Sequence, residues 1–270
     1  MKLAVNYSKE TEELIQEGAI QVDMFKCPDF SDELIKQAES TKRSYIHFDL
    51  NAGSGQMGEV NWERIKYLKK NTNTPYINVH AVAYAKDFPN VDVLTTDQTD
   101  IKKIIHAVVH DIEMLAEKVG AENIILENVI CRGKGDYMMR PIIEPAVISG
   151  IIGQTGCGLL LDIAHAQMTS MCLGFDVKDY ISQLPLEHLK ELHITGIQYH
   201  DESRRLRDSM PMTEDDWNLA SWSLKQIKAG NWPEPWVVAF EYGGVGPIFE
   251  WRTDKKVLAE QLPVLYNLVK

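Results

Sequence analysis

Histidine and carboxylate residues recur at positions where short apolar segments of this chain come to an end. In residues 158–166, the leucines at 159–161 lead directly into Asp162, and His165 follows three positions later. A short apolar segment of this kind is typical of a strand that is buried on both faces. A carboxylate at its end is costly to bury unless it is paired or binds a metal ion. The same pattern is repeated at His47, His80, Glu127, His193 and Glu241.

Imidazole and carboxylate ligands together suit iron, manganese or zinc, whereas carboxylates alone would suit magnesium or calcium. Taken singly, each residue has a simpler explanation. A strand histidine is more often a hydrogen-bonded core residue, and a buried glutamate is more often half of an ion pair. Because six separate segments end in this way, we predict a site for two or three metal ions that share a bridging carboxylate.

The elements that must position these residues alternate between strand and helix. We expect strands at residues 3–6, 20–25, 45–50, 76–82, 124–129, 158–164, 189–195 and 237–242. We expect helices at residues 8–17, 31–39, 62–70, 97–119, 145–154, 177–183, 214–229 and 255–269, and a polar loop at 196–212. This alternation predicts an α/β fold, a single (β/α)8 TIM barrel domain over residues 1–270, with a doubly wound open sheet as the alternative. The C-terminal ends of barrel strands converge on one face, which would bring the predicted ligands together.

The net charge of the chain, its lack of long apolar runs and its cysteine spacing indicate which kinds of partner and which cellular environment to expect. The chain has 28 basic and 39 acidic residues, and its net charge of −11 disfavours nucleic acid and anionic membranes as partners. The sequence shows neither a signal peptide nor an apolar run long enough to cross a bilayer, so we expect a cytoplasmic protein. The four cysteines lack a CxxC spacing, and we expect them to be reduced thiols.

The segment from Glu127 to Leu219 resembles the multinuclear non-heme iron-dependent oxidative enzyme family, within the xylose-isomerase-like barrels. The residues that carry the likeness are Glu127-Asn128-Val129, residues 155–162, Gly174-Phe175-Asp176, Tyr180-Ile181, residues 184–186 and 191–196, residues 208–212 and Trp217. The first strands match more loosely, through His47 and His80. The resemblance implies two or three iron ions that oxidise a peptide with dioxygen. The substrate would be a cysteine-containing precursor peptide, often delivered by a partner protein.

Carried over residue by residue, the family's ligands are His47, His80, Glu127, Asp162, His193, Asp208 and Glu241. Glu127 is the candidate bridging carboxylate, because it lies centrally in the strand order. The chain departs from the family at Met210, where a histidine is usual, and a thioether is a poor ligand for hard iron. It also has Ala164-His165 where the family usually has two asparagines. His165 is therefore the candidate for the missing nitrogen, and His200 is a second.

Two related enzyme classes remain open. A resemblance to endonuclease IV would place the same ligands and His165 around three zinc ions, but the acidic charge argues against a DNA substrate. A resemblance to sugar isomerases and epimerases would use one divalent ion, such as manganese or zinc, on a small-molecule ketose. Its ligands would be Glu127, Asp162, His193 and Glu241. In that case Glu127 and Glu241 would be catalytic and would shuttle protons. A non-catalytic metal-binding or scaffold protein is a third possibility.

The predicted loop at residues 196–212 is rich in arginine. Arg204, Arg205 and Arg207, with His200 nearby, are candidates for binding a carboxylate or phosphate of the substrate. The alternative is a solvated loop in which these arginines pair with acidic neighbours of the same loop.

Overall fold

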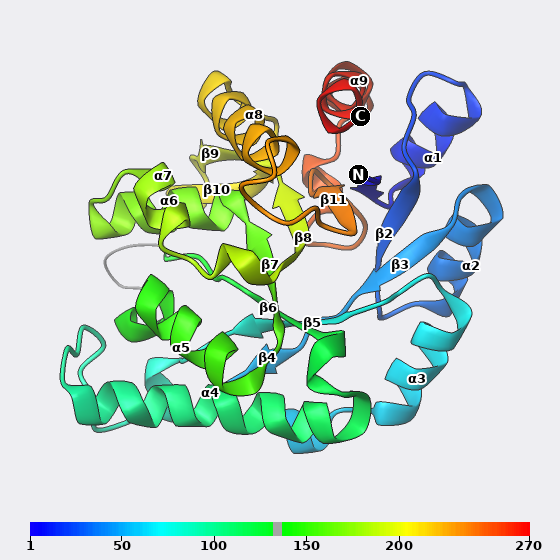
Figure 1. The fold of residues 1–270 in the computed structure, drawn as a ribbon. Helices are drawn as coiled ribbons and strands as arrows, with labels where there is room; N and C mark the ends of the chain where they lie inside the picture. The colour runs from blue at the N-terminus through cyan, green and yellow to red at the C-terminus, as the bar shows by residue number, and fades with distance from the viewer. Residues whose placement is uncertain (132–136) are drawn as a thin grey trace. The chain divides into compact units, whose positions relative to one another are not determined.

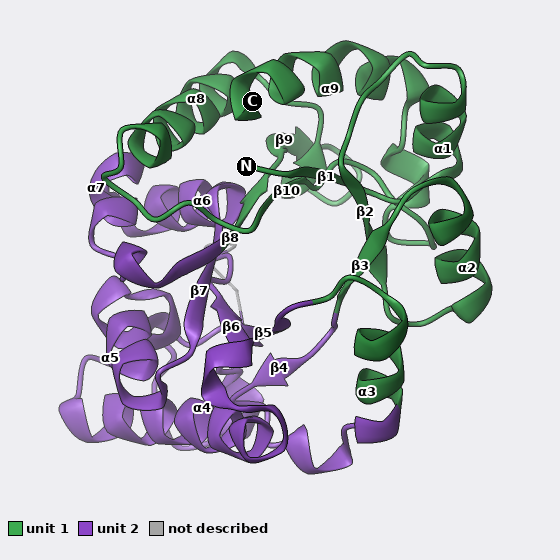
Figure 2. Ribbon diagram, turned by 45° about the vertical axis from the view of Figure 1, so that its right-hand side comes forward, with its two compact units in different colours: residues 1–47, 64–74, 191–270 green, residues 48–63, 75–190 purple. Residues whose placement is uncertain are grey.

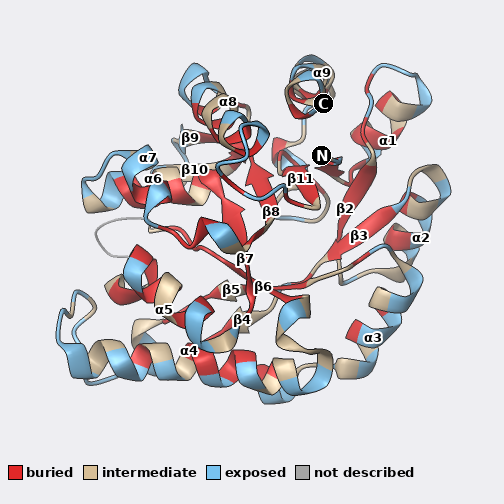
Figure 3. Ribbon diagram, viewed as in Figure 1, coloured by how far each residue is buried: buried red, intermediate tan, exposed pale blue. Residues whose placement is uncertain are grey.

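The computed structural model describes residues 1–131 and 137–270, and these residues form two compact units (Figures 1 and 2). Unit 1 comprises residues 1–47, 64–74 and 191–270. Unit 2 comprises residues 48–63 and 75–190. Each unit is built from parallel strands that alternate with helices along the chain, and the strands are its most deeply buried part (Figure 3).

The parallel strands of unit 1 lie in the order β3-β2-β1-β11-β8. Their bounds are β1 Leu3–Asn6, β2 Met24–Pro28, β3 Ser44–His47, β11 Val237–Phe240 and β8 Leu189–Ile194, of which the first two residues belong to unit 2. The helices are α1 Lys9–Gln16, α2 Asp32–Thr41, α8 Glu214–Lys228 and α9 Lys255–Val269, with most of α3 Trp62–Asn71 and the 3-10 helix η6 Glu250–Arg252. Ala4, Met24, Tyr45, Val237 and Ala239 form a buried cluster between these strands, and Trp236 packs against it.

The strands of unit 2 lie in the order β7-β6-β5-β4 and are also parallel. Their bounds are β4 Asn51–Ala52, β5 Ile77–Ala81, β6 Ile124–Glu127 and β7 Gly158–Asp162. The helices are α4 Gln98–Val119, α5 Pro145–Thr155, α6 Ile163–Leu173 and α7 Val177–Ser182. Short 3-10 helices occur at η1 Met57–Glu59, η2 Ala85–Asp87, η3 Ala121–Asn123, η4 Arg140–Ile143 and η5 Leu186–His188.

Most helices begin where the sequence offers a capping side chain. Ser8 and Thr213 each form a capping box at the start of α1 and α8, and Asp97 accepts two backbone N–H bonds at the start of α4. These side chains satisfy N–H groups that have no partner within the helix. The predicted helices at these positions are therefore confirmed to within a few residues.

The second predicted strand, at residues 20–25, is displaced. The structure starts β2 at Met24, and the chain reaches it through a turn at Asp23, whose carboxylate accepts the N–H of Leu3 at 2.7 Å. Ile20 and Val22 are only 4% exposed, although they lie outside the strand. Both side chains are buried by packing of the turn and not by a strand. The prediction, which was based on apolar character alone, therefore started the second strand four residues before the true start at Met24.

The sixth predicted strand, at residues 158–164, ends early because a helix begins. Asp162 is the N-cap of α6, and its Oδ1 accepts the N–H of His165 at 2.8 Å. The prediction missed α6 because apolar residues are spread around the whole helix and give no helical stripe. As a consequence His165 lies in the first turn of a helix.

The predicted polar loop at residues 196–212 is an antiparallel hairpin of β9 Gly196–His200 and β10 Arg205–Met210. A Cβ atom on Gly196 would lie 2.2 Å from the carbonyl oxygen of Pro211, so the close approach of the two ends requires glycine at this position. Ser209 has a positive φ of 52° and interrupts the regular pairing.

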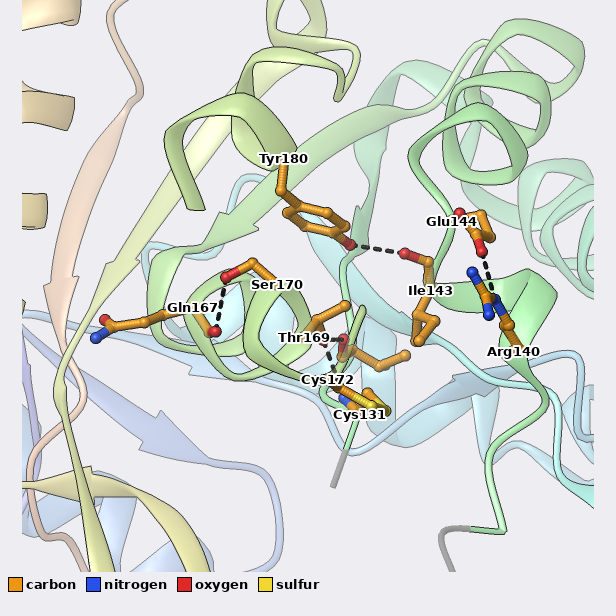
Figure 4. Close-up of a disulfide and its surroundings, with 10 residues drawn as sticks. Cys131, Arg140, Ile143, Glu144, Gln167, Thr169, Ser170, Cys172 and Tyr180 are labelled. Atoms are coloured by element: carbon orange, nitrogen blue, oxygen red, sulfur yellow. Dashed lines mark hydrogen bonds and ion pairs between the residues drawn. A yellow bond between two sulfur atoms is a disulfide. The ribbon is translucent and has the colours of Figure 1, made fainter. Parts of the chain in front are cut away.

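The expectation of four reduced thiols is wrong for two of the cysteines. Cys131 and Cys172 form a disulfide that joins the segment after β6 to α6, both in unit 2 (Figure 4). Thr169 supports the same junction, because its hydroxyl accepts the N–H of Cys131 at 2.9 Å and lies 3.1 Å from the carbonyl oxygen of Val129. The pairing could not be predicted from the sequence because the two cysteines are 41 residues apart. Cys27 and Cys157 are buried free thiols.

Within the two described ranges, none of the helices combines the length and the apolar character that crossing a membrane requires.

Candidate metal centre

Three of the predicted ligands come together within unit 1. His47 is the last residue of β3, His193 lies near the end of β8, and Glu241 directly follows β11. Each offers one ligand atom, and these three atoms lie within 4.8 Å of one another. The parallel register places His193 beside Ala239 on β11, two residues before Glu241. The strand ends therefore bring together two imidazoles and a carboxylate from distant parts of the sequence.

Glu191 fixes the orientation of His193. Its Oε1 lies 2.8 Å from His193 Nε2 and also accepts the hydroxyl of Tyr45 at 2.8 Å. Its Oε2 accepts the indole N–H of Trp236 at 3.0 Å. An ionised carboxylate can only accept hydrogen bonds, so Nε2 of His193 carries the proton in this contact. Nδ1, which lies 2.9 Å from Glu241 Oε1, is then the nitrogen that can serve as a ligand.

The pKa values of His193 and Glu241 are shifted by their mutual contact. Burial lowers the pKa of His193, but the charge of Glu241 and hydrogen bonds with Glu191 and Glu241 outweigh this effect and raise it to about 10. Burial raises the pKa of Glu241, yet the charges of His193 and Lys26 hold it well below 4.5. At neutral pH the two form an imidazolium–carboxylate pair, and a metal ion would have to displace its proton.

Four of the other predicted ligands meet in unit 2. Glu127, at the end of β6, is 1% exposed, and His80 on β5 lies beside it in the parallel register. His80 Nε2 lies 3.3 Å from Glu127 Oε2, and His165 Nδ1 lies 3.4 Å from Glu127 Oε1. His165 Nε2 lies 3.6 Å from Asp162 Oδ2. Two imidazoles and two buried carboxylates therefore form one continuous cluster.

Both histidines of unit 2 contact a backbone carbonyl through the other ring nitrogen. Nδ1 of His80 lies 3.2 Å from the carbonyl oxygen of Leu50, and Nδ1 of His165 lies 2.8 Å from that of Asn128. A carbonyl oxygen can only accept, so Nδ1 carries the proton and Nε2 faces a carboxylate. His193 is held in the same manner by Glu191. Histidines that bind metal ions usually have this arrangement.

Asn128 holds the ends of β6 and β7 together. Its side-chain amide donates to the carbonyl oxygen of Asp162 and its side-chain oxygen accepts the N–H of the same residue, both at 2.9 Å. Because its backbone carbonyl also contacts His165, this one residue fixes both Asp162 and His165.

Asp208 is in a different environment from the other predicted ligands of unit 1. The buried Arg252 donates to its backbone carbonyl at 2.5 Å and lies 3.5 Å from Oδ1 of its side chain. Met210, at the end of β10, is partly buried. Asp208 thus lies in an ion pair, whereas His47, His193 and Glu241 form the tight group.

The residues predicted to bind substrate lie on or near the β9–β10 hairpin. The ring of His200 packs on Trp251, with the ring centroids 4.7 Å apart, and its Nδ1 contacts the hydroxyl of Ser203. Arg207 donates to the same hydroxyl at 3.0 Å. Arg204 lies in the turn with a positive φ of 50°, and Arg205 begins β10. His200 and Arg207 thus contact Ser203 of the same hairpin, and His200 also packs on Trp251.

The donor sets of both units fit a divalent transition metal. Each unit offers two imidazoles and at least one carboxylate, the mixture that iron, manganese and zinc prefer. Buried carboxylates at this density are otherwise expensive, and a bound cation would offset that cost.

Two residues of this centre were not predicted from the sequence. Glu191 precedes His193 by two positions, and residues two apart on a strand point to the same face, so this spacing was a usable signal. Lys26 lies within a run of apolar residues on β2, is 8% exposed, and forms a short ion pair with Glu241. A lysine is rarely buried unless it is paired, so its position in the apolar run was also a signal.

Comparison with solved structures shows the fold. An L-ribulose 3-epimerase superposes with a TM-score of 0.58 at 14% identity, covering 99% of this chain and 94% of that chain. A D-psicose 3-epimerase from Clostridium cellulolyticum, solved with D-tagatose, gives a TM-score of 0.55 at 13% identity, covering 100% and 98%. The predicted fold class, an α/β barrel of the xylose-isomerase-like type, is therefore confirmed.

Comparison with curated protein sequences finds relatives that match a smaller part of the chain than the solved structures do. A "UPF0276 protein" of Acaryochloris marina is 24% identical over 156 residues, which are 57% of this chain and 49% of that protein. Another from Rhizobium meliloti is 37% identical over 81 residues, which are 28% and 26%. The chain thus spans about half or less of the length of these relatives.

The sequence model of one family covers most of the chain. The family is described as "RiPP precursor modification enzyme MbnB/TglH/ChrH", where RiPP denotes a ribosomally synthesised and post-translationally modified peptide, and its model matches residues 46–233. All the predicted ligands except Glu241 lie within that range. The chain therefore belongs to the MbnB/TglH/ChrH family of RiPP precursor modification enzymes.

Proposed function

We propose that this protein is a metal-dependent enzyme that oxidises a peptide with dioxygen, using two or three bound iron ions. The observation that supports a metal centre most strongly is the common arrangement of His80, His165 and His193. In each ring one nitrogen contacts a backbone carbonyl or a carboxylate, while the other faces a second carboxylate. A neutral imidazole has only one N–H donor, so an acceptor beside each of its two nitrogens calls for a second proton or a cation, and three histidines held in this manner favour metal ligands.

Each unit has its own group of proposed ligands. In unit 1 they would be His47, His193 and Glu241, and in unit 2 His80, Glu127, Asp162 and His165. Asp208 is a further proposed ligand, which would have to leave Arg252 to bind a metal ion. When bound, iron would supply one-electron redox chemistry and would accept a substrate thiolate.

The chain's own residues would hold this centre in place. Glu191 would keep His193 in the tautomer whose Nδ1 is a ligand, and Asn128 would fix Asp162 and His165. Glu127 has two carboxylate oxygens, and a different imidazole lies beside each of them. Oε2 faces Nε2 of His80, a nitrogen that can serve as a ligand, whereas Oε1 faces the protonated Nδ1 of His165. Glu127 remains the proposed bridging carboxylate because it lies centrally among the ligands in the strand order.

The family to which the chain belongs modifies RiPP precursors, and we infer a peptide substrate from that membership. A cysteine thiolate of the peptide would be the group that reacts, and a partner protein would deliver the peptide. His200, Arg204, Arg205 and Arg207 remain candidates for binding a carboxylate of the peptide, because the hairpin that carries them is partly exposed.

The test is a reaction with defined peptides. The protein would be loaded with iron(II) under anaerobic conditions and mixed with a set of short synthetic cysteine-containing peptides, and air would then be admitted. We expect a mass change in one peptide that requires iron, dioxygen and the cysteine, with a Cys→Ser peptide as the control. Iron-loaded protein that consumes no oxygen with any of these peptides would contradict the proposal.

A sugar isomerase or epimerase is the alternative proposal. Its favouring observation is that both proposed proton-transfer residues lie beside imidazoles, with Glu127 buried and the side chain of Glu241 13% exposed. That activity would need one divalent ion and no dioxygen. Turnover of a ketose by the manganese-loaded protein in the absence of air would favour it over peptide oxidation.

A further inference from the structure

Lys26 places a positive charge where the proposed centre would bind another cation. It lies in the middle of β2, between Phe25 and Cys27, which are both fully buried, and is itself only 8% exposed. Its ammonium contacts Oε1 of Glu241, the same oxygen that faces Nδ1 of His193. One carboxylate oxygen therefore already serves a lysine and a histidine.

The other charged and titratable groups around Lys26 come from several strands. Its charge acts on His193 of β8 and on Cys27 of β2, while Glu241 also experiences the charge of His47 at the end of β3. Glu191, on the far side of His193, is engaged by three hydrogen-bond donors. Glu241 is thus the carboxylate in unit 1 that can neutralise both Lys26 and a bound metal ion.

We propose that Lys26 is a positioning residue that holds Glu241 and lowers the affinity of the His47–His193–Glu241 group for a divalent cation. A carboxylate shared with an ammonium offers less negative charge to a metal, and the ammonium repels the metal at close range in a poorly solvated site. The inference rests on the proposed function, since it assumes that this group binds metal. The inference goes beyond that function by assigning to Lys26 an upper limit on the affinity of the His47–His193–Glu241 group for a metal ion.

The test measures metal affinity in the absence of any substrate. Metal-free wild type and Lys26→Met would be titrated with cobalt(II) against a competing chelator, with the visible absorption of bound cobalt as the readout. We expect Lys26→Met to bind cobalt roughly tenfold more tightly or better, because a neighbouring unit charge is removed. Lys26→Arg, which keeps the charge, should stay close to wild type. Lys256→Met removes a charge from a side chain that is 81% exposed, and it should have no effect.

A double variant isolates the role of Glu241. In a Glu241→Gln background, Lys26→Met should change cobalt affinity much less than it does in the wild type, because the shared carboxylate is gone. Thermal unfolding would confirm that each variant is folded. If Lys26→Met folds but binds cobalt as weakly as wild type, or more weakly, the inference about Lys26 is wrong while the metal centre stands. If neither wild type nor any variant binds cobalt or iron, the proposed function fails, and this inference fails with it.

Discussion

Replacing Glu191 by glutamine tests whether the hydrogen bonds behind His193 organise the proposed metal centre. The wild-type carboxylate accepts bonds from the hydroxyl of Tyr45, from Nε2 of His193 and from the indole of Trp236, at 2.8, 2.8 and 3.0 Å. A glutamine has nearly the same shape but only one acceptor oxygen. Its NH2 group must face at least one of these donors and leave it unsatisfied.

The expected loss of stability follows from the number of hydrogen-bond donors that each substitution leaves unsatisfied. An unsatisfied buried donor costs about 1–3 kcal/mol, so Glu191→Gln should lower the free energy of unfolding of the metal-free protein by about this amount. Glu191→Ala would leave all three donors unsatisfied and should cost more. Loss of the hydrogen-bond partner of a metal-binding histidine typically weakens metal affinity by about 10- to 100-fold, and we expect a loss in this range.

Two assays separate the effects. Urea unfolding of the metal-free protein reports stability, and competitive titration with cobalt(II) reports affinity. Glu187→Gln is the matched control, because the side chain of Glu187 is 75% exposed and should change neither quantity. If Glu191→Gln lowers stability but leaves metal affinity unchanged, Glu191 only stabilises the fold, and our account of His193 is refuted.

Three further predictions concern the disulfide and the individual ligands. Cys172→Ser should lower the free energy of unfolding by about 4 kcal/mol at most, from the chain entropy of a loop that spans 41 residues. Urea unfolding of wild type with a reductant should reproduce this loss, and equal stability of wild type and variant without reductant would show that the bond does not form. Glu127→Gln should reduce metal bound per chain, as measured by elemental mass spectrometry, because one of the two oxygens between His80 and His165 becomes an amide; an unchanged content would exclude the bridging role. Met210→His should increase metal bound per chain in the same assay by restoring a nitrogen beside Asp208, and no increase would indicate that a third position is already complete or does not exist.

Much of the fold could be predicted because strand and helix signals are local. The predicted first strand and the last helix, at residues 3–6 and 255–269, match β1 and α9 residue for residue. The errors occur where tertiary packing outweighs the local pattern. Ile20 and Val22 are buried by a turn, and α6 is too uniformly apolar to show helical periodicity. The disulfide depends on the path of 41 residues between its cysteines, which no spacing rule encodes.

The candidate site could be predicted as a set of residues but not as a geometry. Strand-end histidines and carboxylates are visible in the sequence because they interrupt apolar runs. Which nitrogen of His80 or His165 is available depends on where the carbonyls of Leu50 and Asn128 point, and this depends on the folded backbone. The contact of Lys26 with Glu241 joins residues 215 positions apart and arises from the pairing of β2, β1 and β11.

The most direct test of the central claim is the metal content of the protein itself. We would purify it without added metal, once anaerobically and once in air, and determine iron, manganese and zinc per chain by elemental mass spectrometry. The account predicts two or more irons per chain and a change in visible absorption when the anaerobic sample meets oxygen. One manganese or zinc per chain, with no response to oxygen, would contradict it and would favour the isomerase or epimerase alternative.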